Sequence, residues 1–557
     1  MTNTESRVII LGAGPVGLGA ALELARFGVR SVLIEKHAGT SWHPKTRNFC
    51  TRTMEIARGW GGTVYKRLRS IDTPDGWKSP IRFMTSATGE QLGVIESKGF
   101  EGPGRNVTPA LPIMSSQEMI EEILLDAVRS SGMVDVRFGV EALRLVAGGD
   151  SSDREARLEV RHRGTGAVET LSGTALVAAD GAASLIRAEL GLRLDGVQDL
   201  RHIVNCYFRA DIERRIGDRK GVLFFVANER AAGVLQPLDG AGRWLCQISV
   251  APEEWSADVF TAERARDWIR AAVGADDLEP EVVSLGFWKL NATVVERLVQ
   301  GRVVMCGDAA HQFPPTGGLG VNTGLQGMHN AMWKLAYCVQ GRASWSLLDT
   351  YDTERRPVAR AITQQSLQNS MNVARISAAA VSGAESGLSM EEVVTESRRY
   401  GNHLGVEFGA YYESSAVVAD GSRPPEVADS YSDYVQSATP GCRAPHVWLG
   451  RADVAQISTL DLFGPAFTLL TAPEAAAWCD AAARATVSLG ARLDCYRIGA
   501  AGLSDHGGFA SAYGVENDGA VLVRPDGHVA WRSRSAPVAG TELQQALEQI
   551  LGKRETT

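Results

Sequence analysis

Glycines with a fixed spacing near the N-terminus are the first residues whose pattern indicates a chemical task. The motif GxGxxG is present as Gly12-Ala13-Gly14-Pro15-Val16-Gly17. Its first glycine allows a tight turn, its second lets the backbone approach a pyrophosphate, and its third lets a helix and a strand pack closely. Glu35 follows at the end of the next apolar run, where a carboxylate can accept hydrogen bonds from a ribose diol. The pattern predicts a dinucleotide site, because a plain glycine-rich turn leaves Glu35 unexplained. It does not separate NAD from FAD.

Two later segments place acidic residues beside glycines after apolar runs. The first is Ala179-Asp180-Gly181-Ala182-Ala183-Ser184-Leu185-Ile186-Arg187, and the second is Cys306-Gly307-Asp308-Ala309-Ala310-His311, followed by a Gly/Pro-rich loop to Asn322. Asp308 can bind the hydroxyls of a ribityl chain, and the loop lets backbone N–H groups reach a planar ring. Simpler interpretations stay open: Asp308 as a helix N-cap, Asp180-Gly181 as a turn with Arg187 a surface charge, and His311 as a satisfied loop histidine.

Hydrophobic periodicity places these motifs on definite elements. Strands are expected at 7–11 and 29–34 with a helix at 15–27 between them, which is a β-α-β unit. Helices are expected around 53–60 and 116–130, and short buried strands before Asp180 and Asp308. The helix beginning near Asn322 would point its positive end at whatever the glycine loop holds, and so stabilise negative charge there.

Composition and charge exclude several classes of protein. The chain has 557 residues and a formal net charge of −8, which gives no support to nucleic-acid binding or to an anionic membrane surface. The glycine-interrupted run 8–24 does not resemble a membrane span. Eight cysteines without a CxxC pair argue against a zinc ribbon or a dithiol centre, so no metal is expected. Free thiols and the lack of an export signal indicate a cytoplasmic protein.

The ordered motifs resemble a known family. GxGxxG, then ADGxxSxxR, then GDAAHxxxPxxGxGxNxG followed by Trp333-Lys334-Leu335-Ala336 resembles the single-component (class A) FAD-dependent aromatic hydroxylases, over about the first 400 residues. The resemblance implies bound FAD, NADPH or NADH as a transient reductant, O₂ as co-substrate, and hydroxylation through a flavin C4a-hydroperoxide. For an isoalloxazine, the positive helix end would stabilise the N1–C2=O edge of the reduced ring.

The resemblance also assigns residues. Arg47, in the stretch that wraps the flavin, would line the path of a mobile ring, and Pro314 would pack near its reactive face; with Gln236 these form the expected catalytic set. Gln117 would contact the ribityl chain, although Ser115–Glu118 also reads as a capping box. The expected cofactor contacts are Gly12, Gly14, Pro15, Val16, Gly17, Glu35, Lys36, Arg47, Gln117, Asp180, Gly181, Asp308, Pro315, Gly318, Gly320, Val321 and Asn322.

The expected fold class is α/β. A Rossmann-like FAD-binding domain of the aromatic-hydroxylase type carries an inserted antiparallel-sheet substrate domain and a thioredoxin-like C-terminal α/β domain. The boundaries are 1–190 and 286–400 for the two FAD-binding parts, 191–285 for the substrate sheet, 401–440 for a linker and 441–557 for the tail. The tail resembles that of the phenol and aromatic-polyketide hydroxylases, and a structural or homodimer-contact role is expected for it.

One departure from the family pattern stands in the long helix. Where members usually carry an acidic residue followed by Ala, this chain has Gly327-Met328. The change removes a carboxylate near the start of that helix.

The substrate is expected between the 314–320 loop and one face of the middle sheet. Alternating residues that could line this face are Val204, Cys206, Phe208, Phe224, Val226, Val234, Gln236 and Gln247. Tyr207, His202 and Arg230 are candidates for a base. A bulky phenol or quinone is favoured over a small benzoate. Baeyer–Villiger oxygen insertion and a flavin sensor or carrier without turnover stay open, whereas a halogenase lacks its WxWxIP-like signature and a dehydrogenase would not use the second and third motifs.

Overall fold

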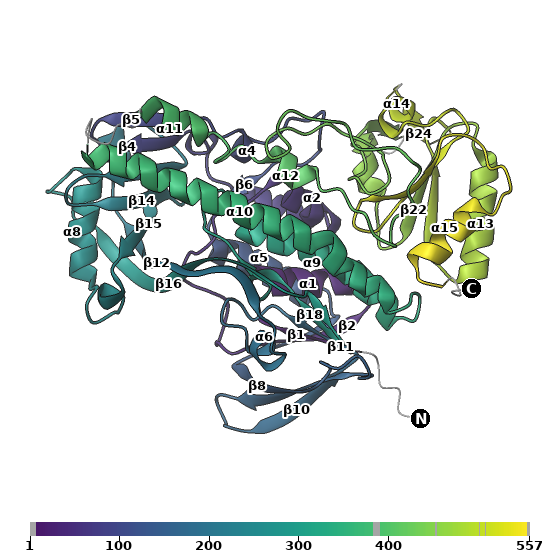
Figure 1. Cartoon of the computed structure of the whole chain (residues 1–557), viewed down its shortest axis with the longest axis horizontal. Coiled ribbons are helices and arrows are strands. Elements are labelled where there is room, and N and C mark those ends of the chain that lie inside the picture. The colour runs from purple at the N-terminus through teal and green to yellow at the C-terminus, as the bar shows by residue number, and fades with distance from the viewer. Residues whose placement is uncertain (1–6, 383–389, 452–453, 501, 507, 554–557) are drawn as a thin grey trace.

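The computed structural model describes residues 7–382, 390–451, 454–500, 502–506 and 508–553 (Figure 1). A six-stranded sheet in the order β17-β18-β11-β1-β2-β7 carries all the glycine-and-acid motifs. Its strands are β1 (Arg7–Leu11), β2 (Arg30–Glu35), β7 (Val134–Phe138), β11 (Ala175–Ala178), β17 (Val299–Gln300) and β18 (Val303–Met305). All neighbours pair in parallel except β17 with β18. The expected β-α-β unit is present as β1, α1 (Pro15–Arg26) and β2.

The order of strands brings distant motifs to one edge. In the register, Leu11 lies beside both Ala178 and Ile34, and Ala178 lies beside Met305. Carboxyl ends of parallel strands meet at the same edge of a sheet, and ligands of open α/β sheets bind outside that edge. The segments that begin at Gly12, Asp180 and Asp308, and the side chain of Glu35, therefore lie next to one another.

An eight-stranded sheet forms the second layer, in the order β19-β16-β12-β15-β14-β13-β4-β5. Its members are β4 (Ile81–Met84), β5 (Gln91–Ile95), β12 (Leu194–Arg209), β13 (Leu223–Ala227), β14 (Ala232–Pro237), β15 (Arg243–Val250), β16 (Glu281–Val295) and β19 (His311–Gln312). It is antiparallel except for the β13–β4 pair, which is parallel. The sheet thus recruits strands from 81–95 and 311–312, beyond the segment 191–285 in which a sheet was expected.

Long helices cover these sheets. Helix α9 (Gly320–Val339) packs against α1, and α10 (Ser346–Ser382) runs diagonally across the molecule from the eight-stranded sheet toward the C-terminal unit (Figure 1). Helix α8 (Ala262–Val273) covers one face of the eight-stranded sheet. The other helices of the first 408 residues are α2 (Thr51–Gly59), α3 (Gly62–Ser70), α4 (Lys98–Glu101), α5 (Gln117–Ser130), α6 (Leu185–Glu189), α7 (Glu213–Ile216), α11 (Met390–Glu396) and α12 (Leu404–Phe408).

Smaller sheets complete this part of the chain. β8 (Val140–Ala147), β9 (Ala156–His162) and β10 (Val168–Gly173) form an antiparallel three-stranded sheet, and β3 (Asn48–Phe49) pairs with β6 (Ile113–Met114). The β3–β6 pair holds the segment around Arg47 beside the start of α5. Ser115 N–H donates to the Arg47 carbonyl over 2.6 Å.

The C-terminal unit is a separate α/β layer, yellow-green in Figure 1. Its four-stranded sheet has the order β23-β22-β25-β26, from β22 (Phe467–Thr471), β23 (Leu493–Arg497), β25 (Ala520–Val523) and β26 (Val529–Ser533). Helices α13 (Ala476–Leu489) and α15 (Glu542–Ile550) pack together on it, and β20 (Trp448–Arg451), β21 (Val454–Ser458), β24 (Leu503–Asp505) and α14 (Phe509–Tyr513) complete the unit. These elements agree with the thioredoxin-like pattern expected from the sequence.

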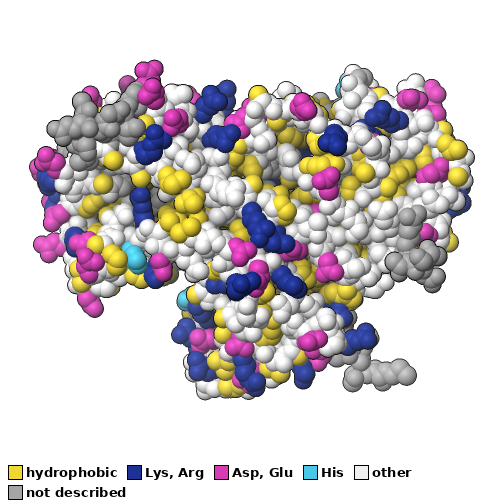
Figure 2. All heavy atoms as spheres, in the orientation of Figure 1, with side chains coloured by type: hydrophobic (Ala, Val, Ile, Leu, Met, Phe, Trp, Pro, Cys, Tyr) yellow, Lys and Arg dark blue, Asp and Glu magenta, His cyan; other side chains and the backbone are white. Residues whose placement is uncertain are grey.

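The distribution of surface charge and the state of the cysteines can now be described. Figure 2 shows basic and acidic side chains interspersed over the visible face rather than gathered into one basic stripe. Among the described helices, none has the length and hydrophobicity needed to cross a membrane. All eight cysteines are free thiols. Within the described ranges, no three His, Cys, Asp or Glu side chains are grouped so that they could hold a metal ion.

Candidate active site

The glycine turn after β1 has no room for a side chain at two of its glycines but leaves free space beside the third. Gly12 has φ +102°, and a Cβ there would lie 2.3 Å from the Ala179 carbonyl oxygen. A Cβ at Gly17 would lie 1.9 Å from the Gly12 carbonyl oxygen. By contrast, a Cβ at Gly14 would meet nothing within 4 Å. Two glycines are therefore required by packing within the protein, whereas the space beside Gly14 is free for a ligand at the N-terminus of α1.

Glu35 closes the turn from the side of β2. Its Oε2 accepts a hydrogen bond from Ala13 N–H over 3.0 Å, and its Oε1 accepts one from His37 N–H over 3.0 Å. A carboxylate has about four lone-pair sites, so Glu35 can still accept from a ribose hydroxyl. Neighbouring Lys36 is exposed. The structure thus brings Glu35 to the turn and leaves the Lys36 side chain at the surface.

Asp180 presents a carboxylate oxygen without a partner. Its Oδ1 is buried and has no hydrogen-bond partner among the described residues, while Oδ2 accepts a long bond from Ile186 N–H, 3.4 Å. Burial raises the pKa of this carboxyl. An orphaned buried acceptor is costly unless a ligand satisfies it, and a ligand hydroxyl would do so.

Asp308 follows β18 at the same sheet edge as Asp180, which follows β11. The protein packed around it raises the pKa of its carboxyl, yet its side chain is exposed. A group that is surrounded and still accessible lines a concave surface. The N-cap alternative for Asp308 is not realised, because the short 3₁₀ turn here begins after Cys306 and has no side-chain cap.

Arg187 connects the second and third motifs, a role that sequence reasoning missed. Its guanidinium donates to the Ala309 carbonyl over 3.0 Å and to the Ala182 carbonyl over 2.7 Å. It is therefore a tie between two loops rather than a free surface charge. The only sequence signal for this was its fixed place at the end of the second motif.

The loop 314–320 presents backbone donors. Helix α9 begins at Gly320, and its first internal bond is Thr323 N–H to the Leu319 carbonyl, 2.8 Å. The N–H groups of Gly320, Val321 and Asn322 belong to the first turn, which has no carbonyl one turn back to bond. Pro314 is buried and Pro315 exposed, and Gly318 has φ +67°. The far side of the loop is held by α10, because Thr316 Oγ1 donates to the Ser366 carbonyl over 2.6 Å.

The Asn322 side chain faces the protein, not the loop's open side. Its Oδ1 accepts from Cys50 N–H (2.9 Å) and from the Thr53 hydroxyl (2.8 Å). Its Nδ2 donates to the carbonyls of Gly318 (2.8 Å) and Asn48 (3.3 Å). These four bonds use all the side-chain donors and acceptors, so only the backbone of Asn322 is free to contact a cofactor.

Arg47 spans the boundary between the two large sheets. Its guanidinium donates to the Val222 carbonyl over 2.8 Å and, by a short bond, to the Pro237 carbonyl. Burial lowers the pKa of this group to about 10, so it stays charged. Gln236 is 8% exposed and adjoins Pro237 on β14. The structure therefore brings Arg47 and Gln236 to the same region.

Gln117 begins α5 but is already bound on both sides. Its Oε1 accepts from Thr46 N–H over 3.1 Å, and its Nε2 donates to Glu121 over 2.6 Å. The alternative capping box is not formed, because Ser116 Oγ donates to Glu118 and the N-cap has no side-chain bond. Glu121 was missed by sequence reasoning. Burial raises the pKa of its carboxyl to about 6.

The expected pocket lining mixed the two faces of the eight-stranded sheet. Val204, Cys206, Phe208, Phe224 and Val226 pack in the core beneath α8, so they cannot line a pocket facing the flavin loop. Alternation predicts which residues share a face but not which face is covered. The opposite face carries Val234, Gln236 and Gln247 and, beyond those expected, Tyr207, Leu238, Leu245 and Phe225.

The candidate bases divide in the same way. His202 shares its strand face with Val204 and packs on Trp255, with ring centroids 5.0 Å apart. Arg230 forms an exposed pair with Asp276. Tyr207 lies on the loop-facing side, and its hydroxyl accepts from Arg243 over 3.0 Å. Tyr400, a further buried tyrosine on this side, packs edge-on against Phe225 at 5.7 Å.

Known families match both parts of the chain. Residues 5–366 match the model described as FAD binding domain, and residues 437–553 match the model described as aromatic-ring hydroxylase, C-terminal. The tetracenomycin A2 monooxygenase-dioxygenase of Streptomyces glaucescens is 33% identical, covering 100% of this chain and 99% of that protein. The 2,4-dichlorophenol 6-monooxygenase of Delftia acidovorans is 30% identical, with 99% of each covered. A crystal structure of aklavinone-11 hydroxylase with FAD and aklavinone is 31% identical, covers 99% of this chain and 100% of that one, and superimposes with a TM-score of 0.84.

Proposed function

Because this chain belongs to the FAD-dependent aromatic-ring hydroxylases and is thus a FAD-dependent monooxygenase, we propose that it hydroxylates a bulky phenolic, polyketide-like aromatic substrate. The main support is structural. Three motifs meet at one edge of the six-stranded sheet, and the eight-stranded sheet provides an apolar face for a substrate. The residues fit FAD, since the space beside Gly14 is open and the Asp180 Oδ1 lacks a partner among the described residues.

Each motif then has a task in holding the cofactor. The turn Gly12–Gly17 and α1 would hold the pyrophosphate, Glu35 a ribose, and Asp180 and Asp308 hydroxyl groups along the chain between phosphate and ring. When bound, FAD supplies the redox chemistry that passes electrons from NAD(P)H to O₂. The first-turn N–H groups of α9 would face the ring edge and stabilise negative charge there.

The remaining assigned residues act around the ring. We propose that Pro314 borders its reactive face and excludes water, since it is buried, while the exposed Pro315 and the left-handed Gly318 shape the loop. Arg47 and Gln236 would border the ring and the substrate where the two sheets meet. Lys36 is the weakest assignment, because its side chain is exposed. An Arg47→Lys variant keeps the positive charge, but a lysine cannot bind the Val222 and Pro237 carbonyls in the same forked geometry. We therefore expect the movement of the flavin ring to change while FAD remains bound.

The substrate class follows from the lining and from the relatives. The loop-facing side carries Tyr207, Leu238, Leu245 and Phe225, which suits an extended aromatic surface. Arg47 is already engaged by two carbonyls, which disfavours a site built around a benzoate carboxylate. Relatives include hydroxylases of polyketides and of phenols. The apolar extent of this face favours the larger class.

The test is turnover by purified, FAD-loaded protein in air. NADPH and NADH are compared across polycyclic phenols, quinones and small phenols, with reductant loss, peroxide and product mass followed together. Substrate-stimulated reductant loss with one oxygen added to a ring carbon, located by NMR, supports the proposal. A ring-expanded lactone would indicate Baeyer–Villiger oxidation instead, and a flavin that stays oxidised with every substrate would favour the sensor or carrier.

Three organisational statements are also proposals. The domain division 1–190, 191–285, 286–400, 401–440 and 441–557 stays a proposal: the separate four-stranded sheet supports the boundary at 441, whereas the eight-stranded sheet crosses the boundaries at 190 and 285. Limited proteolysis tests the division. A cytoplasmic location is supported by eight free thiols. A homodimer through the tail is an expectation from the family, and light scattering on the full chain decides it.

A further inference from the structure

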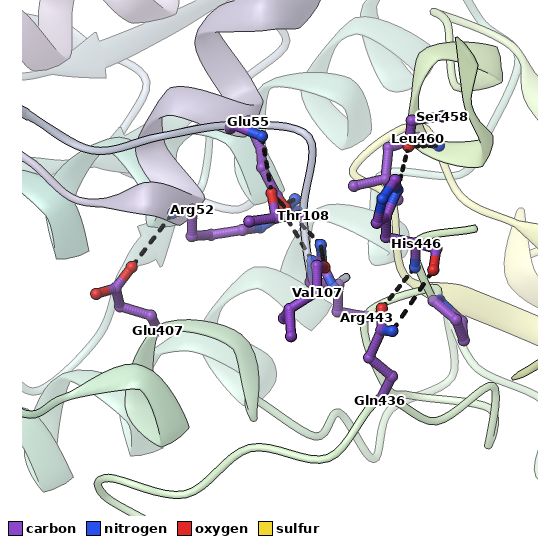
Figure 3. A network of polar contacts seen from close by, with 12 residues as sticks. Arg52, Glu55, Val107, Thr108, Glu407, Gln436, Arg443, His446, Ser458 and Leu460 are labelled. Atoms are coloured by element: carbon purple, nitrogen blue, oxygen red, sulfur yellow. Dashed lines mark hydrogen bonds and ion pairs between the residues drawn. The ribbon is translucent and has the colours of Figure 1, made fainter. Parts of the chain in front are cut away.

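A dense set of buried charges lies between the C-terminal unit and the helices behind the flavin loop. The turn 524–528, between β25 and β26, meets α2, α9 and α10 there. Figure 3 shows one side of this contact, where Arg443 and Thr108 meet Glu55 and the Arg52 backbone meets Glu407. We call the set the interdomain charge cluster; its charged members are Arg52, Glu55, Lys334, Glu354, Arg355, Glu407, Arg443, Arg524 and Asp526.

The cluster contains more cations than carboxylates. Glu55 is shared by Arg52 and Arg443. Glu354 is shared by Lys334 and Arg524, and Arg524 also binds Asp526. Counting Glu407, four carboxylates face five Lys and Arg side chains. Burial lowers the pKa of neighbouring His528 to about 4, so this imidazole is neutral at pH 7 and leaves the excess at one positive charge.

Arg355 is the cation of the cluster for which the described part of the chain supplies no carboxylate partner. Its side chain belongs to α10, and the residue is 4% exposed. Its Nη1 donates to the Tyr412 hydroxyl over 3.1 Å, but its Nη2 is buried and has no hydrogen-bond partner among the described residues. A buried guanidinium with an unsatisfied donor is costly unless an anion or a polar group meets it.

Gly327 explains why none of the acids in the described ranges pairs with Arg355. It lies on α9 directly opposite, and a Cβ built there would be 3.9 Å from Arg355 Nε and 3.4 Å from the Tyr351 hydroxyl. A carboxylate on residue 327 would thus reach the guanidinium. The absence of a side chain at this position leaves the charge uncompensated.

A recess lies beside this charge. Its charged lining residues are three arginines and two carboxylates, so the cations are in excess by one: Arg52, Arg355, Arg443, Glu407 and Asp526. His329, Asn330 and His528 also line it. Together with its solvent-filled mouth it measures about 310 Å³, but its interior takes only about one water-sized group. The size of this interior favours a single small ion over sulfate, phosphate or an organic acid.

We propose that this recess is a binding site for a small monovalent anion, chloride in the cell, which takes the place of a carboxylate at position 327 and compensates Arg355. The anion would join α10 to the C-terminal unit. The site lies behind α9, away from the open side of the flavin loop, so its occupancy is separable from turnover.

The first test compares chloride with gluconate on the FAD-loaded full chain at equal ionic strength. Anything that binds the native state alone raises Tm in a saturable way. We expect chloride, but not gluconate, to raise Tm by about 2 °C or more. Equal Tm values in the two salts at all concentrations would overturn the proposal.

Matched variants at residue 327 locate the effect. Gly327→Asp supplies the missing carboxylate, so Tm should rise in gluconate and the chloride increment should vanish. Gly327→Asn has nearly the same shape without charge, so its Tm should not rise in gluconate; a gain equal to that of Gly327→Asp would contradict the argument from charge. An Asp variant that keeps the full chloride increment, with no gain in gluconate, would contradict the assignment to Arg355.

A structural readout uses bromide. Crystals of the wild-type protein grown in sodium bromide should show an anomalous peak in the recess, within contact distance of the Arg355 guanidinium, and Gly327→Asp crystals should lack it. No peak at that position in the wild type, at bromide concentrations that saturate the Tm shift, would overturn the site.

Discussion

The flavin edge of the six-stranded sheet and the interdomain charge cluster are both polar, yet they treat polar groups in opposite ways. At the flavin edge, the Asp180 Oδ1 lacks a partner among the described residues and the space beside Gly14 is open. In the cluster, Glu354 accepts from Arg524, Lys334 and Asn330 and has no exposed surface. Groups awaiting a ligand are left unsatisfied, whereas groups that dock one part of the chain on another are satisfied in advance. Arg355 Nη2 and Glu407 Oε1 are exceptions within the cluster, since neither atom has a hydrogen-bond partner among the described residues. Arg355 carries the inference above because it also forms no ion pair with a carboxylate there.

The largest expected effect is a difference in apoprotein stability between alanine substitutions at two glycines of one motif. Gly17→Ala puts a methyl group 1.9 Å from the Gly12 carbonyl, so we expect the apoprotein to be destabilised by about 1–3 kcal/mol or more and FAD to be lost. Gly14→Ala meets nothing within 4 Å, so the apoprotein Tm should stay within about 1 °C of wild type while FAD affinity falls at least tenfold. Thermal unfolding and FAD titration measure the two quantities. Equal destabilisation of both apoproteins would refute the distinction.

The next effect concerns the satisfied carboxylate. Glu354→Gln leaves Lys334 and Arg524 buried with a neutral partner, so the free energy of unfolding should fall by about 3–5 kcal/mol in urea titrations. The control is Glu296→Gln, which breaks the exposed pair with Arg193 and should cost at most about 1 kcal/mol. Similar losses in the two variants would mean that the cluster contributes no more than a surface pair.

Two glutamates should give pH dependences of opposite sign. Burial alone would raise the pKa of Glu55, but Arg443 and Arg52 lower it to about 2. Its stabilisation is therefore present above pH 4.5, the ordinary value, and is lost as pH falls toward 2. Burial raises the pKa of Glu121 to about 6, so its contribution is present below pH 4.5 and is lost as pH rises through 6.

The matching variants sharpen this contrast. Glu55→Gln should flatten the acid side of the stability profile, and Glu121→Gln should flatten the segment between pH 4.5 and 6, each by about 2–3 kcal/mol, in urea titrations of the apoprotein across pH. A Glu121→Gln profile parallel to wild type over that segment would show that this carboxyl has an ordinary pKa.

The smallest effect is expected at the tie between the second and third motifs. Arg187→Gln loses the donors to the Ala309 and Ala182 carbonyls, and because the side chain is half-buried the cost to unfolding should be about 1 kcal/mol. FAD affinity should fall more than stability, since Asp180 and Asp308 would lose their relative placement. The ratio of the two effects is obtained from FAD titration and urea unfolding of the same preparation, and a loss of stability alone would remove Arg187 from the site.

Local signals predicted the cradle well, because each signal acts within a few residues. Strands β1 and β2, helix α1 and the short strands before Asp180 and Asp308 followed from periodicity and glycines. What local signals could not predict depends on contacts between distant segments. Alternation alone could not tell which of Phe224 and Phe225 faces the pocket, and the structure packs Phe224 in the core beneath α8 and Phe225 on the other face. The sequence also did not indicate that residues more than 260 positions earlier bind the Asn322 side chain; a contact of its backbone with the ring stays a prediction.

The strand order β18-β11-β1-β2 has a consequence for how the enzyme is made. On the ribosome, β1, β2 and β11 emerge long before β18 and α9. Until then the edge of β11 is unpaired, and Cys50 and Thr53 lack their hydrogen-bond acceptor Asn322. An unpaired strand edge is prone to pair with other chains. A nascent chain cannot complete its flavin cradle until about three-fifths of it has been synthesised. Cofactor loading therefore belongs to the late stage of biosynthesis, after the last strand and helix of the cradle have been made.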